Sequence, residues 1–118
     1  MASHNELGQL GEELALTWLQ ENGYAILHRN WRHSHYEIDI VATRGIFLHF
    51  VEVKTRNFSP FGHPEDSVTR KKFKKLQKAA DEYLFRNPGH EWIQYSILSI
   101  TLYKDREPEY FLIEDVFL

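Results

Sequence analysis

The sequence predicts an α/β protein with a mixed central sheet flanked by helices, in the order α-β-β-β-α-β-β. Two segments carry apolar residues at helical spacing, and five runs are rich in the branched and aromatic residues that strands favour. A length of 118 residues and a hydrophobic content of 42% suit one domain over residues 1–118. There is no glycine-rich phosphate loop, and the chain is too short for a doubly wound nucleotide-binding fold.

The first helix is expected over residues 6–22, where the sequence Asn22-Gly23 ends it. Its apolar positions are Leu7, Leu10, Leu14, Trp18 and Leu19. Gly8 and Gly11 lie inside this helix, and each costs ~1 kcal/mol relative to alanine. We therefore expect a packing reason for both glycines.

The second helix is expected over residues 67–85, with Asp66 or Ser67 as its N-cap. Its buried side is predicted to contain Val68, Phe73, Leu76, Ala80, Tyr83 and Leu84. Three strands precede it, at 24–33, 36–42 and 46–55, and two follow it, at 92–104 and 110–118.

The charge is unevenly distributed along the chain. The formal net charge is -3, but residues 28–78 hold eleven of the fourteen Lys and Arg residues against five acids. Such asymmetry suggests one face for a polyanion. The absence of cysteine excludes disulfides and thiolate metal sites. No apolar run approaches the ~20 residues that span a bilayer, so we expect a cytoplasmic protein without membrane association.

Charged residues interrupt the apolar pattern of the second and third strands. Alternation places Glu37 and Asp39 on one face of their strand, and Glu52 and Lys54 share a face of the next strand. A two-residue turn at Arg44-Gly45 would set Glu37 opposite Glu52, with Asp39 diagonal to it. All four charges would then gather on one face of the hairpin.

Such a cluster needs a counter-charge. Two carboxylates ~5 Å apart repel by roughly 3 kcal/mol at an effective dielectric constant of 20. Lys54 can neutralise one charge and a shifted proton another, and a divalent cation would do more than either. Carboxylates completed by water and substrate phosphate are the ligands that Mg²⁺ prefers. The alternative interpretation is that Glu52 and Lys54 form an ordinary surface ion pair.

At these residues the chain resembles the PD-(D/E)xK nuclease superfamily, in which an Asp on one strand and Glu-x-Lys on the next form a metal site. More narrowly, it resembles the YraN-type family of small bacterial proteins, which are similar to archaeal Holliday-junction resolvases. The likeness covers nearly the whole chain, including "GQLGEELALTWLQENGY", "EIDIVA", "FVEVKTR", "FG" at 61–62 and "VTRKKFKKLQKAADEYL". It implies a restriction-endonuclease-like mixed sheet flanked by helices.

The resemblance also implies roles for individual residues. Asp39 and Glu52 would be ligands of Mg²⁺ or Mn²⁺, and the Val53 carbonyl a third ligand. Lys54 would orient the attacking water or stabilise the phosphorane, and Glu12 would help to complete the site. Glu37 is an accessory candidate. The chain departs from the family at Tyr36, where glycine is usual before Glu-Ile-Asp, and at Ser96, where Asp is frequent.

The leading functional hypothesis is a metal-dependent endonuclease acting on DNA, with branched and flapped structures as candidate substrates. The expected DNA contacts are Arg56, Lys71, Lys74 and Lys75, although "RKKFKKLQK" is equally typical of a solvated helix face. One alternative is a nucleic-acid-binding module of the same fold that has lost turnover. Another is a protein-interaction domain. Both a resolvase-like homodimer and a monomer are compatible with the sequence.

Overall fold

Two helices and five strands make up the part of the chain that the structure describes. The structure is a computed structural model, and it describes residues 4–60 and 70–114. The elements are α1 (His4–Glu21), β1 (Ala25–His33), β2 (Tyr36–Arg44), β3 (Phe47–Asn57), α2 (Arg70–Arg86), β4 (Ile93–Leu102) and β5 (Glu109–Glu114). The predicted order α-β-β-β-α-β-β is confirmed. The predicted N-cap, at Asp66 or Ser67, lies outside the described residues.

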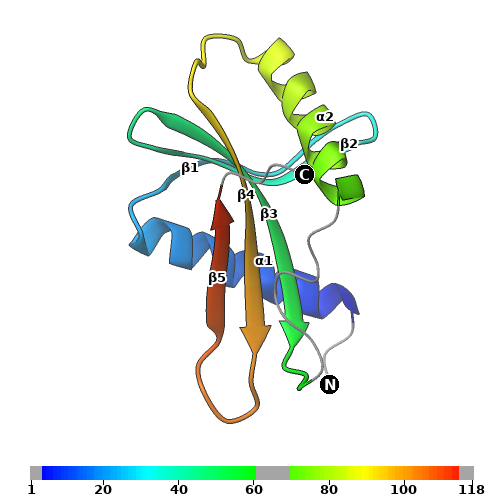
Figure 1. Cartoon of the computed structure of the whole chain (residues 1–118), viewed down its shortest axis with the longest axis vertical. Helices are drawn as coiled ribbons and strands as arrows, with labels where there is room; N and C mark the ends of the chain where they lie inside the picture. The colour runs from blue at the N-terminus through cyan, green and yellow to red at the C-terminus, as the bar shows by residue number, and fades with distance from the viewer. Residues whose placement is uncertain (1–3, 61–69, 115–118) are drawn as a thin grey trace.

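The five strands form one mixed sheet in the order β1-β2-β3-β4-β5 (Figure 1). Neighbouring strands are antiparallel except β3 and β4, which are parallel. A parallel pair needs a crossover connection, and the segment that contains α2 provides it. Neither described helix is long and apolar enough to cross a membrane.

Helix α1 packs against one face of the sheet, where it crosses β3, β4 and β5 (Figure 1). Its buried residues Ala15 and Leu19 contact a core that includes Val51, Leu98 and Ile100. Gly11 is buried because the helix comes close to β3 at this point: a Cβ atom on Gly11 would lie 2.7 Å from the Cβ of Thr55. The expected packing reason is therefore present at Gly11.

Gly8 has a different environment. It is exposed, and a Cβ atom there would meet nothing within 4 Å. The expected packing reason is absent at this position.

Helix α2 packs on the opposite face through a second cluster. Phe73, Leu76, Ala79, Ala80 and Tyr83 are its buried residues. The last four belong to a core cluster with Val41 of β2 and with Leu48 and Phe50 of β3. Phe73 packs separately, with Ile97 of β4. The sheet is thus covered by one helix on each face, as predicted.

The turn between β2 and β3 differs from the sequence-based prediction. Arg44 pairs with Phe47, so the two central residues are Gly45 and Ile46 rather than Arg44 and Gly45. Gly45 has φ 61°, a left-handed conformation that glycine adopts at no steric cost. Facing residues are displaced by two positions from the prediction. Continued one residue past its last pair, Ile40–Val51, this register sets Asp39 rather than Glu37 toward Glu52. A two-residue shift keeps each side chain on its original face, because the strand period is two.

A local distortion in β1 and β2 surrounds Asp39. In the register of these strands Asn30 lies opposite Asp39, and Asn30 has φ 52°. Ile40 belongs to the core beneath α1, whereas Ile38 belongs to the core beneath α2. The regular alternation, which predicts that Ile38 and Ile40 share a face, is therefore interrupted at Asp39. As a result, Asp39 lies at the boundary between the two helix-covered layers.

Candidate active site

One pocket gathers the four charged residues of the hairpin with two lysines of α2. It has a volume of about 290 Å³ and lies between β2, β3 and α2. Its lining residues are Glu37, Ile38, Asp39, Glu52, Lys54, Lys72, Lys75 and Leu76. We call this the carboxylate pocket. The four charged residues of the hairpin do lie together, and the residue that departs from strict alternation is Ile38, which also lines this pocket.

Asp39 is held at the base of this pocket by the main chain of the neighbouring strand. Its Oδ2 atom accepts a hydrogen bond of 2.7 Å from the Val53 N–H. Burial raises the pKa of Asp39 to about 6, and the negative charges of Glu52 and Glu12 add to the shift. The Val53 N–H and Lys54 oppose it. Asp39 is thus a carboxylate that gains from a nearby positive charge.

Glu52 has one oxygen engaged and one without a hydrogen-bond partner. Its Oε1 atom lies 3.0 Å from Lys54 Nζ, and both side chains are less than one-third exposed. Its Oε2 atom is buried and has no hydrogen-bond partner among the described residues. Because a buried acceptor without a partner is costly, this oxygen is suited to a ligand. The ordinary surface ion pair of the alternative interpretation does not describe this environment.

Lys72 is a pocket residue that the sequence interpretation did not single out. It is half-buried, and its pKa is lowered by burial first and then by the positive charge of Lys54. Lys72 precedes the buried residues Leu76 and Tyr83 by four and eleven positions, which places it along the apolar stripe. That position was the available signal: a lysine on a buried helix face needs a partner or a function.

Glu12 approaches the same region from α1, on the other side of Asp39. A second pocket of about 220 Å³ is lined by Leu7, Gly8, Glu12, Asp39, Val53, Lys54 and Thr55. Asp39 and Lys54 line both pockets. The pocket that contains Glu12 therefore adjoins the carboxylate pocket at these two residues. Glu12 Oε2 accepts a hydrogen bond of 3.2 Å from Asn30 Nδ2. The left-handed residue opposite Asp39 thus also contacts Glu12.

The donor set fits a hard divalent cation with few protein ligands. Within residues 4–60 and 70–114, no three His, Asp or Glu side chains are close enough to hold a metal by themselves. Asp39 and Glu52 come directly beyond Ile40–Val51, the last pair of β2 and β3, and both line the carboxylate pocket, where Glu52 offers an oxygen without a partner. Two carboxylates supplemented by a main-chain oxygen, water and phosphate are sufficient for Mg²⁺. The Val53 carbonyl as a third ligand stays a prediction.

The predicted DNA contacts occupy different positions. Lys75 lines the carboxylate pocket, whereas Lys71 and Lys74 are exposed on α2 and do not line it. Arg56 is half-buried on β3, two residues beyond Lys54. Glu37 lines the pocket but is exposed, and its Oε2 atom lies 3.4 Å from Arg32 Nη2. Ser96 lies on β4 beside Val51, a residue of the core beneath α1.

A family model described as "Uncharacterised protein family UPF0102" matches residues 11–101. The chain belongs to this family. The matched range of this UPF0102 protein includes Glu12, Asp39, Glu52 and Lys54. It therefore contains every residue with a predicted catalytic role.

Curated relatives carry the same family name. The UPF0102 protein of Bacteroides thetaiotaomicron is 51% identical over 84 residues, which are 71% of this chain and 69% of the relative. The UPF0102 protein of Flavobacterium psychrophilum is 43% identical over 107 residues, 91% of this chain and 88% of the relative. The names of these relatives state no reaction.

A solved structure shares the fold of this UPF0102 protein. Hjc, a Holliday junction resolvase from Archaeoglobus fulgidus, superposes with a TM-score of 0.50 at 19% sequence identity. The likeness covers 85% of this chain and 71% of the resolvase. It confirms the predicted resolvase-like arrangement of a mixed sheet and flanking helices.

Proposed function

We propose that this UPF0102 protein is a metal-dependent endonuclease that hydrolyses phosphodiester bonds in DNA. The observation that carries the proposal is the carboxylate pocket: Asp39 and the unpartnered Oε2 of Glu52 lie with Lys54 and two lysines of α2. Carboxylates recruit a cation, and the lysines favour the polyanion that must approach it. The fold shared with a Holliday junction resolvase supports the same class of reaction.

Asp39, Glu52 and the Val53 carbonyl would hold Mg²⁺ or Mn²⁺, which when bound supplies an activated water and neutralises phosphate charge. Asp39 is oriented for this role by the Val53 N–H. Lys54 Nζ lies 3.0 Å from Glu52 Oε1 and would donate to a water or phosphate oxygen in the pocket. Glu12, fixed by Asn30, contributes through the pocket that shares Asp39.

DNA binding is proposed to extend from the pocket along α2. Lys75 would contact phosphate at the pocket itself, and Lys71, Lys74 and Arg56 would contact phosphates beyond it. Branched and flapped DNA are the proposed substrates. A homodimer would place two pockets on one junction, whereas a monomer would make single nicks, so sedimentation with and without DNA distinguishes the two forms.

The experiment is nicking of supercoiled plasmid in Mg²⁺ or Mn²⁺, with Asp39→Asn, Glu52→Gln and Lys54→Ala compared with wild type. The expected result is loss of nicking in all three variants with folding retained. Glu109→Gln, at an exposed position of β5, is a charge-matched control and should nick normally. Equal nicking by wild type and all variants would identify a contaminating nuclease.

A second candidate is a DNA-binding module without turnover. It is favoured by the Glu52–Lys54 ion pair and by the absence of a ready three-ligand cluster among the described residues. In that case wild type would bind DNA but show no calorimetric Mn²⁺ binding, even with DNA present.

A further inference from the structure

A third pocket adjoins the carboxylate pocket and has a different chemical character. Its volume is about 420 Å³, within the range of small-molecule sites. Its lining residues are His35, Tyr36, Glu37, Lys75, Lys78 and Ala79. Glu37 and Lys75 line both pockets, so the two spaces are neighbours along one side of α2. We call this the aromatic pocket.

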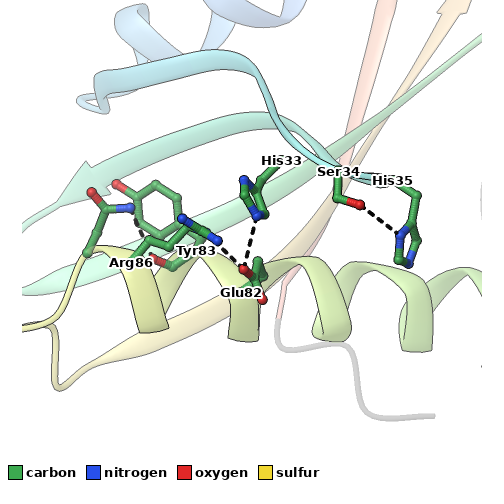
Figure 2. A network of polar contacts seen from close by, with 7 residues as sticks. His33, Ser34, His35, Glu82, Tyr83 and Arg86 are labelled. Carbon is green, nitrogen blue, oxygen red and sulfur yellow. Dashed lines mark hydrogen bonds and ion pairs between the residues drawn. The ribbon is translucent and has the colours of Figure 1, made fainter.

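One side of the aromatic pocket is formed by His35 of the turn between β1 and β2 and by the first two residues of β2. The end of β1 is anchored on α2 just before this turn (Figure 2). His33 Nε2 lies 3.5 Å from Glu82 Oε1, and Arg86 Nε lies 2.8 Å from the same oxygen. Figure 2 shows the turn residues Ser34 and His35 over the helix beyond this contact. Tyr36 packs on the core beneath α2. The turn is therefore attached to the helix on one side of the pocket.

Two aromatic rings and two ammonium groups characterise the lining. The rings of His35 and Tyr36 have centroids 4.2 Å apart and planes inclined by 32°. Lys75 and Lys78 follow one another by three positions on α2 and are exposed. The single acid, Glu37, is paired with Arg32. A ligand that matches this lining has a flat ring to stack and an anionic group beside it.

We propose that the aromatic pocket receives one unpaired nucleotide of the DNA strand whose phosphate enters the carboxylate pocket. This inference rests on the proposed function. The base lies against His35 and Tyr36, and the flanking phosphates lie at Lys75 and Lys78. A base in an intact duplex must first leave its stack, whereas the base of a flap, gap or branch is already free. The pocket therefore selects DNA that has an unpaired nucleotide next to the scissile phosphate.

The test is a double-mutant cycle in which the base is removed from the DNA and the aromatic rings are removed from the protein, separately and together. Fluorescence anisotropy in Ca²⁺ measures the affinity for flapped duplexes of both polarities, with an abasic residue at each of the first three unpaired positions in turn. In wild type, one abasic position should weaken binding by between about fivefold and about 150-fold, the range for loss of one base–aromatic stack.

The variants are His35→Ala and Tyr36→Ala, with Phe85→Ala as control because Phe85 is an aromatic residue of α2 with 81% exposure. In Tyr36→Ala the same abasic position should have no further effect, because base and ring contribute one shared interaction. His35 is exposed, so His35→Ala should leave the core intact and provides the test if Tyr36→Ala does not fold. His35→Ala should reduce the ratio of the affinities for the intact and the abasic flap. Phe85→Ala should keep the wild-type ratio.

Three results would overturn the inference. Wild type could bind intact and abasic flaps equally at every position, the His35 and Tyr36 variants could lose affinity equally for intact and abasic flaps, or wild type could bind no flapped DNA. Asp39→Asn separates this inference from the proposed function, because it should lose nicking and still discriminate against the abasic flap. If instead wild type discriminates but never nicks, the aromatic pocket stands and the nuclease proposal fails.

Discussion

Asp39 Oδ2 accepts the main-chain N–H of Val53 at 2.7 Å, just beyond Ile40–Val51, the last main-chain pair between β2 and β3. The carboxylate thus continues the contact between the two strands at the place where their ladder ends. Its position is fixed by the main chain, while burial and neighbouring acids make its negative charge unfavourable. The same group is therefore a structural link and an electrostatic strain, and the two properties can be measured separately.

The first prediction concerns stability against pH. Because the folded-state pKa of Asp39 is raised to about 6 from 3.8, the folded protein binds this proton more tightly than the unfolded chain. Its contribution is most favourable below pH 3.8 and is lost as pH rises through about 6. Asp39→Asn, which keeps the hydrogen-bond acceptor, should therefore raise the unfolding free energy by about 2 to 3 kcal/mol at pH 7.5 and by little at pH 4.

Urea unfolding at the two pH values checks this difference, with Glu109→Gln as the exposed control. A gain of equal size at both pH values would mean that the substitution acts through packing rather than charge.

The second prediction concerns metal binding against pH. Cation binding requires ionised Asp39, so protons compete with the metal below the raised pKa. Calorimetry should show Mn²⁺ affinity falling about tenfold per pH unit below about pH 6 and becoming level above it. Asp39→Asn should bind more weakly and lack this break. A wild-type affinity that is constant from pH 5 to 7.5 would remove Asp39 from the ligand set.

The third prediction separates the two roles of Asn30, whose backbone has φ 52° and whose amide contacts Glu12. Asn30→Gly keeps the left-handed backbone and removes the amide, so Mn²⁺ affinity should fall with little loss of stability. Asn30→Ala removes the amide and also disfavours the left-handed backbone. Its free energy of unfolding should be about 1 to 2 kcal/mol lower than that of Asn30→Gly, which is the cost of a left-handed alanine.

Ser34 provides the matched control, since it also has a positive φ, of 56°, but lies in the turn between β1 and β2. Ser34→Ala should cost stability relative to Ser34→Gly in the same way, and neither should change Mn²⁺ affinity. If Asn30→Gly binds Mn²⁺ as wild type does, the contact with Glu12 has no part in the metal site.

The fourth prediction compares two glycines of one helix. Gly11→Ala should destabilise the protein by about 1 to 3 kcal/mol, because the new methyl group overlaps the Thr55 side chain and must displace α1 from β3. Gly8→Ala meets open space and should stabilise by up to ~1 kcal/mol through helix propensity. Thermal unfolding of both variants checks the contrast, and a stabilised Gly11→Ala would show that α1 moves freely at this contact.

Most of the fold could be predicted from the spacing of apolar residues, because each strand and helix buries one face and the apolar residues lie on that face. The turn register could not, since Gly45 fits either central position of a two-residue turn. The predicted cluster survives the wrong register, because a shift of two residues changes the face of no side chain, and Asp39 and Glu52 still line one pocket.

Two features of the site lay beyond the sequence pattern. Alternation assumes regular strands, and nothing in "HRNWR" shows that Asn30 takes a left-handed conformation opposite Asp39. Ile38 was consequently assigned to the wrong layer. Lys72 was overlooked because the lysines of α2 were considered as one basic segment, although its spacing from Leu76 places it on the buried stripe.

The last prediction tests whether α2 contacts DNA phosphates. Each lysine that neutralises a phosphate releases counterions, so the salt dependence of binding counts the contacts. Replacing Lys71, Lys74 and Lys75 together with alanine should lower the magnitude of the slope of log K against log salt by roughly two to three on duplex DNA. Base sequence should have little influence, because lysine contacts to phosphate carry no base information.

The control removes three exposed cations that line neither the carboxylate pocket nor the aromatic pocket, Arg44, Lys104 and Arg106, and so changes net charge equally. Since the chain carries a formal net charge of -3, no general positive field binds DNA, and the control should keep the wild-type slope. If both triple variants lower the slope alike, binding depends on overall charge. If the α2 variant keeps the wild-type affinity and slope, these lysines form a solvated face, and the phosphates must pass over the pocket by another path.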